Sequence, residues 1–173
     1  MILFLDLGTH KTGYCLGDGL SVPLCGTVRL TGPADLGGLL TGLETALSDL
    51  SVHGQIEVVG YESPITLRRD SLASKRSLYS LGAFVEWWAL KQSAKCFESS
   101  PQALKKELTG KHNASKSDMV AMAKKCGINL PHGALAEDAA DAFAGWLIAL
   151  RVYNKAARLK WDRRLYGSRG ALL

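Results

Sequence analysis

The sequence has only four cysteines, no long apolar run and no low-complexity or linker-like stretch. The cysteines (Cys15, Cys25, Cys96 and Cys126) follow no C-x-x-C spacing, which argues against a zinc knuckle or a disulfide framework and favours reduced thiols. No stretch of about 18 uncharged apolar residues is present, so we expect no transmembrane helix. The first residues, MILFLDLGTHKTG, lack a basic segment, which argues against a signal peptide. We therefore expect a cytoplasmic protein.

The composition is otherwise that of an ordinary globular chain. Its 173 residues, 47% apolar and 21% charged, are enough for one domain with a sizeable core, so we predict a single domain over residues 1–173. The net charge of +5 is unevenly divided. Residues 1–60 contain two basic and six acidic residues, whereas residues 61–173 contain 19 basic and 10 acidic ones. A basic surface on one part of a domain is typical of nucleic-acid-binding proteins, although a solvated basic face fits the charge equally well.

Apolar runs and helical spacing predict a single α/β domain. Three strands follow one another near the N-terminus, with Gly17-Asp18-Gly19 as a tight turn between two of them, which predicts antiparallel pairing. Later strands alternate with helices, so we predict a mixed sheet flanked by helices. The predicted strands are Ile2–Leu5, Gly13–Gly17, Ser21–Leu30, Ile56–Tyr61 and Ala94–Glu98. The predicted helices are Ala34–Ser51 after Pro33, Ser71–Gln92, Pro101–Leu108, a helix capped by Ser115 or Ser117 that ends at about Lys125, and Ala134–Tyr153. A basic tail follows at about residues 154–173.

Four carboxylates are distinguished by their positions. Asp6 ends the first strand and Glu62 ends the strand after the first helix, and functional groups collect where strands of such sheets end. In EDAADAFA, Asp138 and Asp141 stand at i and i+3, on one helix face whose alanines permit close packing on a sheet. Carboxylates on an apolar face need compensation, which Mg²⁺ or Mn²⁺ would supply. The alternatives stay open that Asp138 only caps its helix, that Asp141 pairs with a lysine and that Asp6 only forms a turn.

These acids, and a basic segment between them, resemble the RuvC-type Holliday junction resolvases of the RNase H-like superfamily. Asp6 in FLDLGTHKTGY, Glu62 in VVGYES, and Asp138 and Asp141 in EDAADAFA resemble the acidic tetrad of that family in order and spacing. The segment SPQALKKELTGKHNASKSDMVAMAKK resembles its basic stretch, in which lysines approach the scissile phosphate. The resemblance covers about residues 1–150 and is closer to the compact viral or phage members than to the bacterial enzyme.

The resemblance implies an RNase H-like fold and a metal-dependent endonuclease that symmetrically nicks four-way DNA junctions as a homodimer. It implies that Asp6, Glu62, Asp138 and Asp141 hold two Mg²⁺ ions, for which Mn²⁺ can substitute, and that Lys105 and Lys116 are catalytic contacts to the phosphate. It also points to the helix at 71–92 as the dimer interface. That helix has more apolar surface than one face against a sheet would use, supplied by Leu78, Leu81, Phe84, Val85, Trp87, Trp88 and Leu90.

Basic residues near the acids are the predicted DNA contacts, and their alternative is again a solvated charged face. They are Arg68, Arg69, Lys75, Arg76, Lys105, Lys106, Lys111 and Lys116. One departure from the family concerns strand separation. Bacterial members carry an aromatic wedge a few residues after the glutamate, where this chain has Ser63-Pro64-Ile65-Thr66, so whether Ile65 replaces the wedge stays open.

Three other functions are weighed against this one. The segment Asp6-Leu7-Gly8-Thr9 also resembles the first phosphate loop of actin-like ATPases and sugar kinases, but 173 residues do not supply their second lobe. An RNase H-like nuclease acting on forks, flaps or RNA–DNA hybrids uses the same chemistry and stays open. A non-catalytic module that binds branched DNA explains the basic half of the chain but leaves the four acids unexplained.

Overall fold

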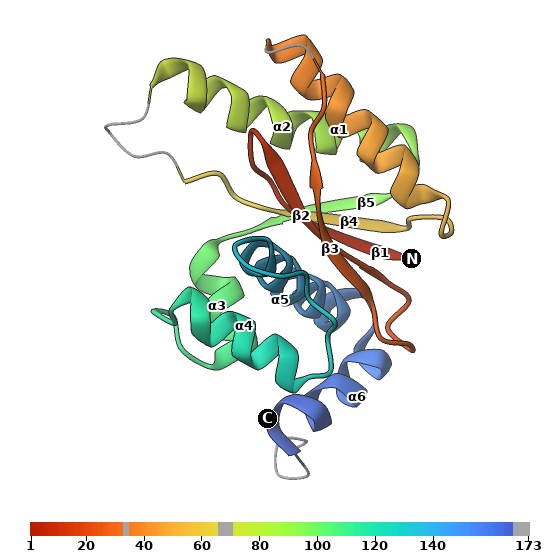
Figure 1. The fold of residues 1–173 in the computed structure, drawn as a ribbon. Helices are drawn as coiled ribbons and strands as arrows, with labels where there is room; N and C mark the ends of the chain where they lie inside the picture. Colours follow the sequence, from red (N-terminus) through yellow and green to blue (C-terminus); the bar gives the residue numbers. More distant parts are fainter. Residues whose placement is uncertain (33–34, 66–70, 168–173) are drawn as a thin grey trace.

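The computed structural model describes residues 1–32, 35–65 and 71–167, and its centre is a five-stranded mixed sheet in the order β3-β2-β1-β4-β5 (Figure 1). Strands β1 (Ile2–Asp6), β2 (Lys11–Gly17) and β3 (Leu24–Arg29) pair antiparallel. Strand β4 (Val58–Glu62) runs parallel to β1, and β5 (Lys95–Ser99) runs parallel to β4. The predicted α/β class and mixed sheet are confirmed.

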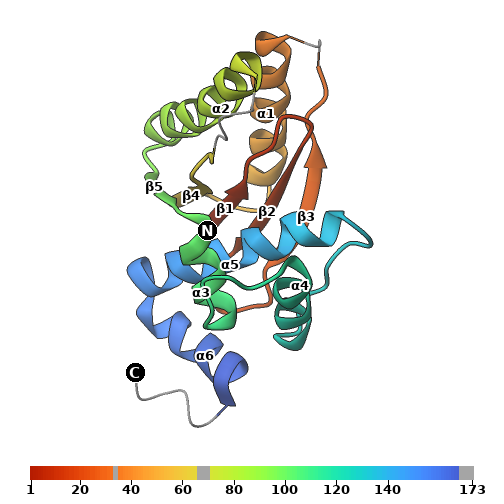
Figure 2. The ribbon, with the colours of Figure 1, turned by 90° about the vertical axis from the view of Figure 1, so that its left-hand side faces the viewer.

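Helices cover both faces of the sheet (Figures 1 and 2). Helices α1 (Leu36–Ser51) and α2 (Leu72–Lys91) lie on one face. On the other lie α3 (Pro101–Thr109), α4 (Lys116–Lys125), α5 (Leu135–Tyr153) and α6 (Lys155–Tyr166), with α5 directly against the strands. Alternate residues of β1 divide between the two layers, as the two-residue period of a strand requires. Leu3 and Leu5 pack toward α1 and α2, and Ile2 and Phe4 pack toward α5.

Two predicted element starts differ from the structure because side chains set them. Strand β3 begins at Leu24 rather than Ser21, since the Asp18 carboxylate accepts hydrogen bonds from the backbone N–H groups of Leu20 and Ser21 and holds them in a turn. Helix α1 begins at Leu36 because Asp35 caps it, accepting from the Gly38 N–H at 2.7 Å. The predicted helix start at residues 33–34 lies outside the described residues. Ser115, one of the two predicted caps, caps α4.

Residues 155–166, within the predicted basic tail, form the separate helix α6. Asn154 ends α5 and caps α6, its side chain accepting from the Ala157 N–H at 3.1 Å. Trp161 is fully buried, and its indole N–H donates to the Gly19 carbonyl at 3.2 Å. Helix α6 is therefore docked onto the turn between β2 and β3.

The exposed apolar residues of α2 are fewer than the sequence predicts. Leu81, Val85 and Trp88 pack in the core beneath α2, so their assignment to a dimer interface is wrong. Trp87, which is 49% exposed, and Leu90, which is 76% exposed, remain at the surface. No helix in the described part of the chain is long and apolar enough to cross a membrane.

Helix α5 approaches the sheet closely because Gly145 has no side chain. A Cβ at this position would clash with the ring of Phe4, which is fully buried in β1. We expect Gly145→Ala to lower the free energy of unfolding by about 1–3 kcal/mol, the usual cost of overpacking a core. Gly37→Ala is the matched control, because it lies in α1 with its nearest atom 3.4 Å from the added Cβ. Urea denaturation should show the control unchanged or up to about 1 kcal/mol more stable, and equal effects would contradict this account of the packing.

Candidate metal centre

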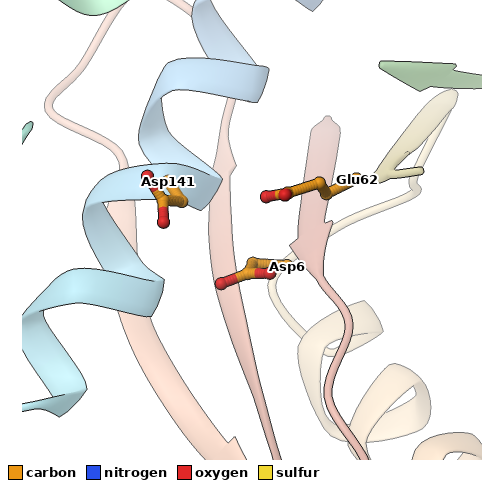
Figure 3. A group of neighbouring side chains, drawn as sticks. All are labelled: Asp6, Glu62 and Asp141. Carbon is orange, nitrogen blue, oxygen red and sulfur yellow. The ribbon is translucent and has the colours of Figure 1, made fainter. Parts of the chain in front are cut away.

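Three carboxylates from three different elements meet at one edge of the sheet (Figure 3). Asp6 ends β1, Glu62 ends β4 and Asp141 lies in the second turn of α5. One oxygen of each lies within 4.8 Å of the others. The parallel strands pair Leu5 with Tyr61, so the next residues along them, Asp6 and Glu62, reach the same edge, as predicted. No metal-ligating group of three or more, other than this one, occurs among residues 1–32, 35–65 and 71–167.

Gly13 allows α5 to lie over this edge. It is paired with Asp6 across β1 and β2, and a Cβ there would clash with the backbone of Asp138. The alanines beside the acids, Ala139, Ala140 and Ala142, are fully buried, as the close packing predicted from EDAADAFA requires. The start of α5 therefore lies against the strand next to Asp6. The sequence analysis did not identify Gly13 as a site residue, and only its place in TGY beside the strand end distinguishes it.

The pKa values of all three acids are raised, by burial first and by neighbouring carboxylates second. Burial raises the pKa of Asp6 well above its usual range, and the charges of Glu62 and Asp141 raise it further. Burial and the charge of Asp141 raise the pKa of Glu62 to about 7. Burial likewise raises the pKa of Asp141 to about 6, although Lys116 and Lys105 lower it. Clustered, desolvated carboxylates of this kind fit a divalent cation, which prefers hard oxygen ligands and removes the repulsion.

The fourth predicted acid, Asp138, is close to this cluster but outside it. Its carboxylate forms an ion pair with Lys11 of β2, whose Nζ also donates to the Ala134 carbonyl at 3.3 Å. The charge of Asp138 still contributes to raising the pKa values of Asp6, Glu62 and Asp141. The structure thus brings three of the four predicted acids together and gives the fourth a lysine partner. Lys11 was not predicted as part of the site.

The two predicted catalytic lysines lie beside the acids on separate helices. Lys116 begins α4, where Ser115 and Asp118 form a capping box, and its Nζ donates to Glu137 at 2.8 Å. This hydrogen bond raises the pKa of Lys116, whose charge in turn lowers the pKa of Glu62. Lys105 in α3 also lowers the pKa of Glu62. Both lysines are therefore within electrostatic reach of the acids.

The other predicted DNA contacts are spread over a wider surface. Lys106 is exposed on α3, and Lys111 borders a small hollow beside α4. Lys75 is half-buried on α2, and Arg76 is exposed and borders a second hollow near His10. Arg68 and Arg69 lie outside the described residues. Ile65, the candidate for the missing wedge, is 53% exposed.

Comparisons with known proteins agree with this arrangement at the level of fold. No family model matches the chain, and no match is found among curated proteins. Solved structures do match. A Thermus thermophilus RuvC structure has a TM-score of 0.65 at 16% identity, covering 87% of this chain and 96% of that one. The fold is that of RuvC.

Two further structures give the same result. T. thermophilus RuvC in complex with a Holliday junction substrate has a TM-score of 0.65 at 15% identity and covers 96% of both chains. The yeast mitochondrial Holliday junction resolvase Ydc2 has a TM-score of 0.57 at 14% identity, covering 91% of this chain and 82% of that one. The predicted RNase H-like fold, of the RuvC kind, is therefore confirmed.

The raised pKa values predict how stability depends on pH and on divalent cations. Because the folded-state pKa values of Glu62 and Asp141, about 7 and about 6, exceed the ordinary values of 4.5 and 3.8, these groups favour the folded state only while protonated. Their contribution is complete below about pH 4 and is lost as the pH rises through 6 to 7. We expect the Tm in EDTA to fall between pH 5 and pH 8, and Mg²⁺ to raise it more at pH 8 than at pH 5.

Thermal unfolding of wild type and Asp141→Asn, with and without Mg²⁺, tests this expectation. The variant lacks one of the repelling charges, so its Tm should fall less with pH and respond less to Mg²⁺. Asp118→Asn is the control, because Asp118 is an exposed acid of the α4 capping box, and its Mg²⁺ response should equal that of wild type. A wild-type Tm that is indifferent to Mg²⁺ at pH 8 would exclude a cation at the three acids.

Proposed function

We propose that this chain is a metal-dependent endonuclease that binds branched DNA, four-way junctions above all, and nicks it symmetrically. The observation that carries the proposal is the cluster of Asp6, Glu62 and Asp141, partly buried at a sheet edge with their oxygens within 4.8 Å of one another. Two lysines lie beside this cluster, as an anionic substrate requires. The shared fold with the T. thermophilus RuvC that was solved with a Holliday junction substrate supports the choice of branched DNA.

The metal we propose is Mg²⁺, with Mn²⁺ able to substitute, bound as two ions per site. The donors are all carboxylate oxygens, which suit these hard cations. Asp6 is the ligand that we propose the two ions would share, because the charges of Glu62, Asp141 and Asp138 all raise its pKa. We propose Asp138 as the fourth ligand. To bind the second ion, its carboxylate would have to leave its ion pair with Lys11. When bound, such a pair of ions supplies an activated water and stabilises the leaving oxygen of a phosphodiester.

The lysines have a separate part in the proposed reaction. Negative charge grows on the phosphate oxygens as the water attacks, and a fixed positive charge beside them lowers the energy of that state. We propose that Lys105 and Lys116 provide it, because the charge of each lowers the pKa of Glu62. The pair between Lys116 and Glu137 is largely exposed, at 63% and 36%, so little energy holds it and a phosphate can replace the carboxylate. Lys75, Arg76, Lys106 and Lys111, with Arg68 and Arg69, would bind the flanking backbone.

We further propose that the chain acts as a two-fold dimer through α2. A four-way junction has near two-fold symmetry, so one active site per protomer matches a cut in each of two opposed strands. Trp87 and Leu90 present apolar surface on α2, and Phe84 packs on Trp87 with 5.4 Å between ring centroids. Large exposed apolar side chains grouped on one helix are typical of a protein–protein contact.

The first prediction separates cleavage from binding. Asp6→Asn and Asp141→Asn keep the shape of the side chain and remove its charge, so each should lower Mg²⁺-dependent junction cleavage by more than about 100-fold. Junction affinity, measured without divalent cations, should change little. Asp118→Asn is the matched control and should cut at the wild-type rate. Cleavage by Asp141→Asn at a near wild-type rate would refute the metal-centre assignment.

The substrate of this cleavage is tested with the same preparations. Labelled four-way junctions, forks, flaps, linear duplex and RNA–DNA hybrid are incubated with wild type and with Asp6→Asn. We expect the junction to be cut fastest, with paired nicks in opposed strands. Faster cleavage of the hybrid or the fork would favour the other RNase H-like activities, and binding of junctions without any cleavage would favour a non-catalytic module.

The second prediction concerns the dimer. Trp87→Glu places a charge in the proposed interface, so its dimer dissociation constant should rise at least about 10-fold. Val52→Glu is the control, because Val52 is 80% exposed at the end of a different helix, α1. Sedimentation at micromolar concentration should give a dimer for wild type and for the control. A monomeric wild type that nicks both strands in one binding event would be incompatible with this model.

A further inference from the structure

Helix α6 presents basic residues that neither the core nor the metal centre uses. Its only acid, Asp162, is paired with Arg158 at 2.8 Å. Arg158 is buried and also pairs with Glu107 of α3 at 2.9 Å. The acids of this region are therefore neutralised inside the molecule. Arg163 and Arg164 point to solvent, and no carboxylate of the described residues forms an ion pair with either.

The position of α6 is fixed by contacts along its length. Trp161 Nε1 donates to Gly19, Lys160 donates to the Leu20 carbonyl, and the Tyr166 hydroxyl donates to the Glu107 carbonyl at 3.2 Å. The Arg164 guanidinium lies over the Trp161 ring, 4.6 Å from its centroid. A helix held by these contacts places its charges at defined points.

These charges lie next to basic residues at the end of α4. Lys116 opens α4, and Lys125 closes the same helix about 14 Å further along its axis, on the opposite face of the helix. Lys111 and Lys125 border one hollow between the α3–α4 loop and α4. The charges of Lys125 and Arg164 both lower the pKa of the Cys126 thiol, which burial raises to about 11, so both lie close to that residue. The series Lys111, Lys125 and Arg164 thus lies where α4 ends next to α6.

We propose that this series, here called the α4–α6 basic face and made of Lys111, Lys125, Arg163 and Arg164, binds the phosphate backbone of a duplex arm leaving the cleavage site. The inference rests on the proposed function and adds to it a second contact with the DNA. A duplex carries one charge per about 1.7 Å, so about nine phosphates lie along the length of α4. The face binds backbone and not bases, since its groups are long cationic side chains on a helix surface, without a sequence-reading element.

The test measures a protein variant and a DNA variant separately and together, so that the basic side chains are examined with and without the phosphates that they are proposed to contact. The protein variant is Lys125→Gln/Arg164→Gln, and the DNA variant is a four-way junction with neutral methylphosphonates about 4 to 10 base pairs from the crossing point, roughly 14–34 Å at 3.4 Å per pair. Affinities are measured in EDTA. We expect the double variant to bind the unmodified junction about 10-fold more weakly, with a salt slope lower by about 2. On the neutralised junction, wild type and variant should bind equally.

Matched variants separate this contact from a general loss of charge. Lys95→Gln/Lys155→Gln removes two charges near Tyr153, where β5 begins and α5 ends, and should leave affinity and salt slope unchanged. Lys125→Gln/Arg163→Gln keeps the contact between Arg164 and Trp161 and should repeat the loss, which excludes a folding defect as its cause. Cleavage at saturating enzyme should remain at the wild-type rate in all three.

Several results would overturn the inference. Wild-type affinity and salt slope in the double variant would do so, as would an equal loss in the Lys95 and Lys155 control. If the double variant bound the neutralised junction more weakly than wild type, by the same factor as on the unmodified junction, the α4–α6 basic face would not contact those phosphates. A wild type that binds junctions in this manner but never cuts them would refute the proposed nuclease and leave the α4–α6 basic face standing.

Discussion

The repulsion between three partly buried carboxylates is the constraint on which the rest of this molecule depends. Asp6, Glu62 and Asp141 are partly desolvated at one sheet edge, where the charges of Glu62 and Asp141 raise the pKa of Asp6 and the charge of Asp141 raises the pKa of Glu62. Hydrophobic packing on both faces of the sheet supplies folding free energy that offsets this repulsion. A divalent cation turns the same arrangement from a cost into a binding site, which explains why a stable fold would keep it.

The lysines around the acids reduce the effect of this repulsion in two ways. Lys11 forms an ion pair with Asp138 next to the cluster. The charges of Lys105 and Lys116 lower the pKa values of Glu62 and Asp141, and Lys116 also pairs with Glu137. The helices that carry them, α3 and α4, are fixed against α5, and Glu107 of α3 is in turn fixed by Arg151 and Arg158. The charged surface is thus as well ordered as the site.

Local sequence patterns predict the fold and the two acids at the strand ends. They do not predict which side chains contact the acids of α5. Asp6 and Glu62 each follow a buried apolar run, and parallel neighbours end at one edge, so their meeting is predictable. Spacing at i and i+3 places Asp138 and Asp141 on one helix face, but they lie one turn apart, and Lys11 from another strand reaches only Asp138. That contact depends on how α5 crosses the sheet, which no local pattern contains.

Exposed and buried positions are hardest to predict from the sequence where many apolar residues occur close together, as in α2. Trp87 and Trp88 are adjacent and chemically identical, yet 100° of helical rotation leaves the first exposed and the second buried. The end of α5 is a different case, because Asn154 is a capping residue and its signal for a new helix is present in the sequence. What the sequence lacks is the long-range contact of Trp161 with Gly19, which fixes α6 in place.

The most direct test of the central claim is the position of a bound metal. Anomalous difference density from crystals soaked in Mn²⁺ reports the ion itself, independently of any DNA or activity. We predict a peak in contact with carboxylate oxygens of Asp6, Glu62 and Asp141, at about 2.0–2.2 Å as for other small divalent cations. Density elsewhere on the molecule, with these three side chains bound only to water or to a lysine, would contradict the account.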